Sequence, residues 1–341
     1  MRAVVLVGGE GTRLRPITET IPKPLVPLME RASLDHVLDH LARHDVHEVV
    51  LSSSYLEEEF HAFLQGRHGD PKITWITEEA PLGTGGAIVN ALARVRRRRK
   101  DDEPFFALNG DILTDLDLTT MLAMHRERAA AATIALHHVE DARPFGLVPT
   151  DDDGRVIEFR EKPAELVPGD INAGTYLLTP SSLDAWEPGH HVSIEREIFP
   201  ALIADGAPMY GFASDAYWMD LGTPEKYLQA HFDILDGKVG FEPVYPSPFV
   251  VEGAVVEDGA SLGPWVVVGA GASVAANAEI VDSVLHPHAV VERDARVIGS
   301  ILGPWSRVGG GATINGTVLG EGAVVPGGSV LDGARIASAR A

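Results

Sequence analysis

The stretch VEDGASLGPWVVVGAGASV, residues 256–274, carries an aliphatic residue at every sixth position. The series runs from Val250 to Ile336, in steps of six residues up to Ile280 and in steps of five, six and six after it. Its members are Val250, Val256, Leu262, Val268, Val274, Ile280, Leu285, Val291, Val297, Leu302, Val308, Ile314, Leu319, Val325, Leu331 and Ile336. A turn of 17–18 residues with three inward aliphatic side chains predicts a triangular coil of parallel strands, a short parallel β-helix.

Residues before about 235 follow a different pattern, in which strand-like and helix-like segments alternate. We predict strands over 2–7, 48–54, 72–77, 104–110, 132–139, 155–160, 172–178 and 209–213. We predict helices over 33–44, with Ser33 as its N-cap, and over 56–65, 84–98, 117–129, 195–205 and 224–235. The alternation indicates an α/β fold with a Rossmann-like, mostly parallel sheet that binds ligands at the carboxyl ends of its strands.

This change of pattern predicts two domains joined by a linker. We expect an α/β domain over 1–235, a linker with three prolines over 236–249, and the β-helix over 250–341. A chain of 341 residues is long enough for such a division.

Composition narrows the classes of function. The chain has a formal net charge of −21, which argues against nucleic acid or an anionic membrane as its main partner. It contains no cysteine, so disulfides, thiolate metal sites and cysteine nucleophiles are excluded. No apolar stretch approaches the roughly 20 residues that a membrane span needs, and the N-terminus does not resemble a signal peptide. We therefore expect a soluble, cytoplasmic protein.

The segment LVGGEGTRLRP, residues 6–16, follows the first predicted strand. Its three glycines, Gly8, Gly9 and Gly11, allow backbone N–H groups to surround phosphates, and two arginines follow them. The Walker pattern requires a lysine that this loop lacks, and the dinucleotide fingerprint requires glycine where Leu14 stands. A phosphate loop of another kind remains, with an ordinary glycine turn as the alternative.

A second cationic position follows in IPKPLVPL, residues 21–28. Pro22 and Pro24 restrict the backbone on both sides of Lys23. This restriction suits a lysine that acts as a fixed point charge, although a lone exposed lysine is equally compatible with the pattern.

The segment GGEGTRLRPIT, followed by PKPL, resembles the signature of the sugar-1-phosphate nucleotidyltransferases, also called NDP-sugar pyrophosphorylases. Further matches cover nearly the whole chain: EEAPLGTGGAI (78–88), LNGDIL (108–113), FGLV (145–148), EFREKP (158–163), INAGTYLL (171–178), SIEREIFP (193–200) and YWMDLGTPEKYLQAH (217–231). Within this family the pattern is most similar to the mannose-1-phosphate guanylyltransferases that carry a short β-helix. The resemblance, and not the period, implies that the β-helix is left-handed.

The resemblance implies Mg²⁺-dependent transfer of a nucleotidyl group from an NTP to a sugar 1-phosphate, with release of pyrophosphate. It assigns Arg13 and Lys23 as catalytic cations. It assigns the nucleotide to Leu6, Val7, Gly8, Gly9, Gly11, Thr12, Glu78, Gly83, Thr84 and Gly85, and the sugar phosphate to Gly146, Glu161, Lys162 and Asn172. It assigns the metal to Asp111 and Asp220, and Asp111 also follows a predicted strand, where a ligand carboxylate is expected.

The base is predicted from Glu78. A carboxylate can accept hydrogen bonds from N1–H and N2–H₂ of guanine, whereas it would face the acceptor O4 of thymine or uracil unfavourably. We therefore predict GTP and, with mannose 1-phosphate, GDP-mannose as product. The alternative functions are a glucose-1-phosphate thymidylyl- or uridylyltransferase and a manno-heptose-1-phosphate guanylyltransferase. The alternative to base recognition is that Glu78 and Glu79 are plain exposed acids.

Other classes of function leave different marks on the sequence. A catalytically silent regulatory relative would lack some of Arg13, Lys23, Asp111 and Asp220, and all four are present. A CoA-dependent acyltransferase would use a β-helix histidine, for which His286 and His288 are candidates.

The basic run RVRRRRK, residues 94–100, fits the solvated end of a helix. We also expect a homo-oligomer, with the β-helix as one place for its contacts.

Overall fold

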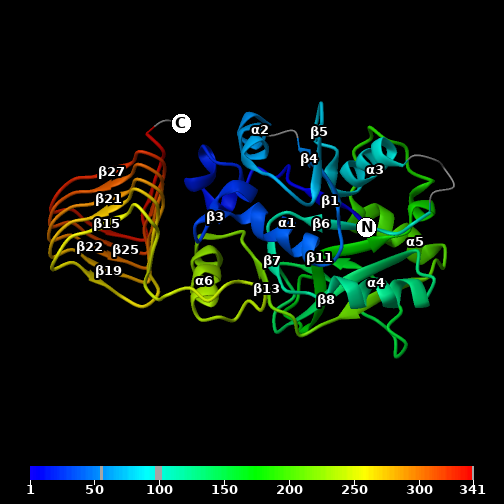
Figure 1. Cartoon of the computed structure of the whole chain (residues 1–341). Coiled ribbons are helices and arrows are strands. Elements are labelled where there is room, and N and C mark those ends of the chain that lie inside the picture. Colours follow the sequence, from blue (N-terminus) through cyan, green and yellow to red (C-terminus); the bar gives the residue numbers. More distant parts are fainter. Residues whose placement is uncertain (54–56, 97–101, 340–341) are drawn as a thin grey trace. The chain divides into compact units, whose positions relative to one another are not determined.

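The computed structural model describes residues 1–53, 57–96 and 102–339 (Figure 1). Residues 97–100 of the predicted basic run lie outside the described residues, as do the ends of the predicted segments that fall in the two internal gaps. The chain divides into two compact units, which are treated separately: Met1–Gly9 with Val37–Trp218, and Glu10–His36 with Met219–Ala341. None of the described helices is both long enough and apolar enough to span a membrane.

The first unit is built on a nine-stranded sheet with the main order β10-β9-β11-β6-β1-β4-β5, in which β8 also pairs with β11 and β12 pairs with β8. Its strands are β1 (Arg2–Leu6), β4 (Glu48–Ser53), β5 (Lys72–Thr77), β6 (Phe105–Asn109), β8 (Ala132–Val139), β9 (Gly146–Leu147), β10 (Arg160–Glu161), β11 (Gly169–Leu178) and β12 (Met209–Ala213). The pairs β1–β4, β1–β6, β4–β5 and β8–β12 are parallel, whereas β11 runs antiparallel to β6 and β8. The predicted α/β class with a mostly parallel sheet is confirmed.

The helices follow the predicted segments closely. They are α1 (Ser33–Arg43), α2 (Glu57–Gly66), α3 (Gly83–Val95), α4 (Leu118–Glu127), a π-helical turn over Ile194–Ile198 that leads into α5 (Phe199–Ala204), and α6 (Pro224–Leu235). Ile88 of α3 and Phe199 of α5 pack with Phe105 and Tyr176 of the sheet in one buried cluster. Burial of such side chains supplies most of the free energy that holds helix to sheet.

Two local predictions are wrong. Residues 155–160 do not form a strand: Arg155 and Val156 make only isolated bridges, and β10 begins at Arg160. Ser33 is the first residue of α1 rather than its N-cap, and its hydroxyl donates to the carbonyl of Pro24 (2.8 Å). Short strands β2 (Pro27–Leu28), β3 (Arg31–Ala32), β7 (Ile112–Thr114) and β13 (Trp218–Asp220) were not predicted, since two or three residues carry no period.

The C-terminal part of the second unit is a coil of short parallel strands (Figure 1, yellow to red). The strands are β14 (Phe249–Val250), β15 (Val255–Val256), β16 (Ser261–Leu262), β17 (Val267–Val268), β18 (Ser273–Val274), β19 (Glu279–Val281), β20 (Val284–Leu285), β21 (Val290–Val291), β22 (Arg296–Ile298), β23 (Ile301–Leu302), β24 (Arg307–Val308), β25 (Thr313–Asn315), β26 (Val318–Leu319), β27 (Val324–Val325), β28 (Val330–Asp332) and β29 (Arg335–Ile336). They form three sheets, in which Val250 pairs with Val268 and Val268 with Leu285.

Every aliphatic residue of the predicted series lies in one of these strands. Most of them, such as Val274, Ile280 and Leu302, are completely buried inside the coil. The parallel β-helix is therefore confirmed, and its strand sheets are consistent with the left-handed coil that the resemblance implied.

Candidate active site

In the first unit, three strand ends bring the glycine loop beside the segment that carries Asp111. Leu6 at the end of β1 pairs with Ser52 of β4 and with Asn109 of β6. The Gly110 amide donates to the Leu6 carbonyl (2.9 Å), so the segment that leads to Asp111 leaves the sheet beside Leu6 and Val7. Parallel strands share this edge, which is where α/β proteins bind ligands.

Glu78 follows β5 at the same edge and is buried, whereas Glu79 is exposed. Glu78 Oε1 accepts from the Ser52 hydroxyl (2.7 Å), and Glu78 Oε2 accepts from the Leu82 amide (3.1 Å). These bonds hold the turn that leads into α3. A carboxylate oxygen has two acceptor positions, so each retains one. The exposed-acid alternative is thus wrong for Glu78, and base recognition by Glu78 stays a prediction.

The start of α3 has a packing role. A Cβ on Gly85 would lie 2.7 Å from Ile198 Cδ1 and 2.9 Å from the Ile194 nitrogen. Thr84 Oγ1 accepts from the Ile194 amide (3.0 Å) and donates to Glu195 Oε2 (2.6 Å). Gly83 and its neighbours therefore seat the helix against the 192–198 segment, and their contact with a nucleotide base stays a prediction.

Several predicted ligands of the first unit surround one buried phenol. Burial raises the pKa of Tyr176 well above its ordinary value, and the negative charges of Glu195, Glu161 and Asp111 raise it further. Asn172 Nδ2 donates to the Tyr176 hydroxyl (2.8 Å). A β-bulge between Asn172 and Tyr176 shifts the register of β11 against β8 at this place. Asn172 thus contacts Tyr176 directly, while the carboxylates of Glu161 and Asp111 act on it electrostatically. Glu195 was not singled out from the sequence, although the SIEREIFP match contained it.

Gly146 and Glu161 face each other across β9 and β10. A Cβ on Gly146 would lie 2.7 Å from the Phe159 ring and 3.1 Å from Glu161 Oε2, so only glycine fits there without displacing these groups. Lys162 Nζ lies 3.8 Å from Glu161 Oε1, with its side chain mostly exposed. A carboxylate and an ammonium side by side can accept from sugar hydroxyls and attract a phosphate.

The second unit contains both predicted catalytic cations, Arg13 and Lys23, and the second predicted metal ligand, Asp220. Asp220 is buried, and its carboxylate lies 3.6 Å from Lys23 Nζ, 3.7 Å from Arg13 Nη2 and 3.4 Å from Lys226 Nζ. Lys23 is also buried, and a buried ammonium requires a nearby countercharge. Lys226 was missed from the sequence, although it lies six residues after Asp220 within a quoted match.

The chain before β2 folds back on itself to bring Arg13 and Lys23 together. Gly11 has φ +62°, and a Cβ there would lie 3.0 Å from Lys23 Cβ. The Thr18 hydroxyl donates to the Gly11 carbonyl (2.8 Å). Thr12 is exposed at the start of the 3₁₀ turn Thr12–Leu14. Glycine is therefore required at Gly11 for both backbone conformation and space.

The histidines considered for acyl transfer have other roles. His286 is buried, with Nε2 2.9 Å from the Tyr227 hydroxyl. That hydroxyl donates to the Pro27 carbonyl, so His286 Nε2 carries the proton. Burial lowers the pKa of His286 to about 4. His288 stacks on Trp305 with 3.9 Å between ring centroids. Neither packing is that of a base open to a substrate.

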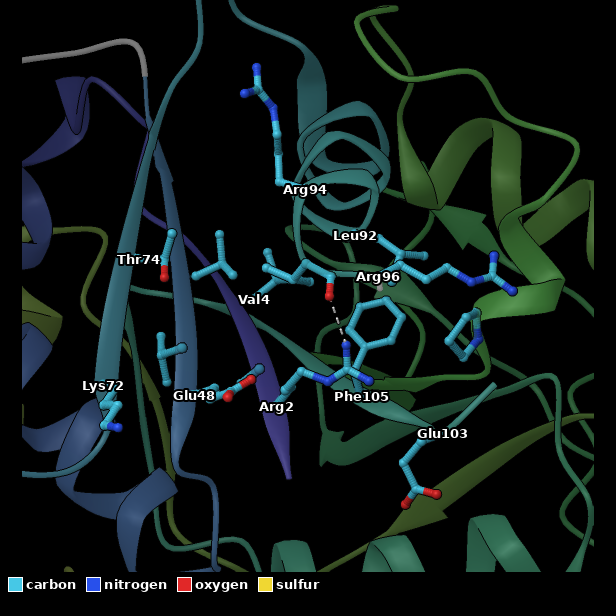
Figure 2. Close-up of a pocket in the computed structure, with 15 residues that line it drawn as sticks. Arg2, Val4, Glu48, Lys72, Thr74, Leu92, Arg94, Arg96, Glu103 and Phe105 are labelled. Carbon is cyan, nitrogen blue, oxygen red and sulfur yellow. Dashed lines mark hydrogen bonds between the residues drawn. The ribbon is translucent and has the colours of Figure 1, made fainter. Parts of the chain in front are cut away.

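A cavity of about 310 Å³ lies at the opposite edge of the first unit's sheet (Figure 2). The cavity is lined by Arg2, Glu48 and Lys72, at the amino ends of β1, β4 and β5. Arg94 in the last turn of α3 and Arg96 just after it also line the cavity. The guanidinium of Arg2 donates to the Val95 carbonyl (3.2 Å), and the dashed line in Figure 2 starts from this guanidinium. None of the predicted site residues lines this cavity.

Comparison with known proteins agrees with the two-part fold. A family model described as nucleotidyl transferase matches residues 2–237, and one described as GMPPB C-terminal domain matches residues 244–341. The mannose-1-phosphate guanylyltransferase of Mycobacterium tuberculosis is 39% identical over 301 residues, which cover 85% of this chain and 81% of that protein.

Two further similarities bear on the base. The UTP–glucose-1-phosphate uridylyltransferase of Synechocystis sp. is 35% identical over 251 residues, 70% of this chain and 64% of that protein. The solved structure of HddC from Yersinia pseudotuberculosis complexed with GMP-PN superposes with a TM-score of 0.58 at 29% identity, covering 67% of this chain and 97% of that one.

Proposed function

Because the chain belongs to the nucleotidyl transferase family, we propose that it transfers the guanylyl group of GTP to α-D-mannose 1-phosphate, forming GDP-mannose and pyrophosphate. The observation that carries this proposal is the cluster of Arg13, Lys23 and Lys226 around the buried Asp220. The guanylyltransferase similarity and the GMP-PN complex of HddC support guanine as the base.

In the proposed reaction an oxygen of the sugar 1-phosphate attacks the α-phosphorus of GTP. A new P–O bond forms, the bond between the α-phosphorus and its bridge to the β-phosphate breaks, and pyrophosphate leaves with the electron pair. The barrier arises mainly from bringing anions together and from charge on the transferring group. Positive charge from Arg13 and Lys23 lowers that barrier, and Lys226 adds a third cation.

The geometry around Asp220 suits this role. The three separations from Asp220 exceed the roughly 2.7–2.9 Å of a tight charge-assisted hydrogen bond. The Arg13 side chain is 63% exposed, and a guanidinium carries five N–H donors. Asp220 therefore orients Arg13 without using its whole donor set, so Arg13 is able to reach a triphosphate.

The family generally uses a divalent metal ion, and we propose Mg²⁺ held by Asp111 and Asp220. Their carboxylates are the hard oxygen ligands that Mg²⁺ takes in ones or twos beside phosphate oxygens and water. Among the described residues, no three or more His, Asp or Glu side chains are grouped to hold a metal. When bound, Mg²⁺ would neutralise phosphate charge, and Asp111 and Asp220 would each supply a carboxylate ligand.

The remaining assignments belong to the same proposal. The nucleotide would contact Leu6, Val7, Gly8, Gly9, Gly11, Thr12, Glu78, Gly83, Thr84 and Gly85. The sugar phosphate would contact Gly146, Glu161, Lys162 and Asn172, which is supported by their grouping near Tyr176 and across β9 and β10. The domain boundaries 1–235, 236–249 and 250–341, and a homo-oligomer, stay predictions.

A second candidate is uridylyl transfer to glucose 1-phosphate, which the Synechocystis relative favours. This reaction differs from guanylyl transfer only in the base of the nucleotide and in the hydroxyls of the sugar. Thymidylyl transfer and a manno-heptose acceptor differ in the same two features.

The test is a pyrophosphate-release assay with GTP, UTP, dTTP and ATP, each crossed with mannose 1-phosphate and glucose 1-phosphate. We expect the highest kcat/KM for GTP with mannose 1-phosphate, and faster turnover of UTP or dTTP would overturn the guanylyl assignment. Asp111→Asn should lose most of the activity with every pair. If Asp111→Asn remains active, the metal assignment is wrong.

A further inference from the structure

The last coil of the β-helix contacts the segment that carries Arg13, and both belong to the second unit. Arg335 of β29 donates through Nη1 to the carbonyl oxygens of Arg13 (3.0 Å) and Arg15 (3.0 Å). Ser338 adds two bonds: its amide donates to Glu19 Oε2 (2.9 Å) and its hydroxyl to the Pro16 carbonyl (3.4 Å). Residues more than 300 positions apart in the sequence are thus joined at four acceptors.

These contacts are not required by the repeat. Other arginines on the surface of the coil pair with carboxylates of neighbouring coils: Arg296 Nε lies 3.0 Å from Glu279 Oε2, and Arg307 Nε donates to Glu292 Oε1 (2.6 Å). Arg335 is also exposed, so it contributes nothing to the packed interior. Its two bonds instead leave the coil for backbone carbonyls.

The two carbonyls that Arg335 binds flank Leu14, at the end of the 3₁₀ turn Thr12–Leu14. Bonds from a charged donor to both carbonyls fix the backbone on each side of this turn. The direction in which the Arg13 side chain leaves the backbone is fixed with it.

The other end of Arg13 is held separately. A Cβ on Gly222 would lie 2.6 Å from Arg13 Nη2, so the guanidinium rests against the backbone of Gly222 beside Asp220. Arg335 therefore holds the base of the Arg13 side chain, while Gly222 and Asp220 hold its tip.

We infer that Arg335 is a positioning residue for nucleotidyl transfer, through which the last coil of the β-helix sets the Arg13 turn for the triphosphate. The inference rests on the proposed function. It gives the β-helix a part in catalysis that acts through Arg13, because the coil places Arg335 at the carbonyls of Arg13 and Arg15.

The test compares Arg335→Met with the matched control Arg296→Met, which removes another exposed arginine of the coil. We expect Arg335→Met to lower kcat/KM for the NTP by on the order of 10- to 100-fold, the loss typical of a catalytic group that is misplaced. The KM for the sugar 1-phosphate should change by less than about twofold, since its predicted ligands lie elsewhere in the chain. Arg335→Lys should restore part of the loss, and Arg296→Met should match the wild type.

The outcomes separate the inference from the function on which it rests. If the wild type releases pyrophosphate and Arg335→Met equals Arg296→Met in all constants, the inference fails alone. It also fails if both KM values rise together with a fall in melting temperature that Arg335→Lys does not repair, because that describes a structural role. A wild type inactive with every substrate pair overturns the proposed function and the inference together.

Discussion

The β-helix and the segment Glu10–His36 belong to one compact unit and are held in opposite ways. In the β-helix the same contact recurs on every coil, with one buried aliphatic residue above the next. In the segment each contact occurs once and joins unlike groups, such as the Thr18 hydroxyl with the Gly11 carbonyl and Lys23 with Asp220. Stability is therefore spread over many equivalent residues in the first region, whereas function depends on single residues in the second.

The largest effect is expected at Asp220, where the segment depends on one carboxylate. Asp220→Asn removes the negative charge that orients Arg13 and Lys23, and it removes a proposed metal ligand. We expect kcat to fall by about 10²- to 10³-fold, the usual loss for a preorganised electrostatic group. Pyrophosphate release by a sample whose circular dichroism matches the wild type measures it, and activity near the wild-type level would contradict the account.

The interior of the β-helix should respond in the opposite manner. Leu302→Ala removes a fully buried side chain and should lower the free energy of unfolding by about 2–5 kcal/mol. The kcat should stay unchanged at temperatures where the protein is folded, because the neighbouring coils still place Arg335. Denaturant unfolding beside kinetics measures both, with the exposed Val324→Ala as control. A loss of kcat in folded Leu302→Ala would break the comparison.

The same difference decides how much could be predicted from the sequence. The period from Val250 to Ile336 predicted every strand of the coil, because each aliphatic residue has to face the interior in its own turn. The strands 72–77, 132–139 and 209–213 were also predicted at their observed bounds, since short runs rich in β-branched, aromatic and other apolar residues are visible in the sequence. The strand predicted over 155–160 is not observed, because this alternating segment makes only isolated bridges, at Arg155 and Val156.

A third prediction concerns pH and the junction between α6 and the coil. The ordinary pKa of histidine is about 6.5, and burial lowers the pKa of His286 to about 4 in the folded protein. Between these values only the unfolded chain takes up the proton, so the stability contributed by neutral His286 is complete above pH 6.5 and is lost as the pH falls toward 4.

His286→Gln keeps a side chain able to bond the Tyr227 hydroxyl and removes the titration. From pH 7 to pH 5 the variant should lose about 2 kcal/mol less unfolding free energy than the wild type. Urea unfolding at the two pH values measures this difference. Equal losses in both proteins would show that His286 does not hold this junction in its neutral form.

The smallest effect is expected at Glu78. Glu78→Gln keeps an acceptor and exchanges the other for a donor, so kcat/KM for GTP relative to UTP should fall by about tenfold. The exposed neighbour provides the control, because Glu79→Gln should leave the ratio unchanged. If both triphosphates lose activity equally, Glu78 serves only to hold the turn before α3.

Part of the candidate site could not be predicted from the sequence, for a physical reason. The residues of the resemblance are each present, yet the sequence did not show that Lys226 joins Asp220 or that Glu78 bonds Ser52 and Leu82. These contacts depend on where distant segments meet, and a single lysine or serine carries no period. The role of Arg335 was invisible for the same reason.

The central claim is guanylyl transfer, and product identification tests it most directly. The purified chain is incubated with GTP, mannose 1-phosphate and Mg²⁺, and the nucleotide sugar is identified by mass spectrometry while pyrophosphate is measured in parallel. The account predicts GDP-mannose and pyrophosphate in equal amounts. Absence of GDP-mannose, with UDP- or dTDP-glucose formed from the corresponding substrates instead, would contradict it.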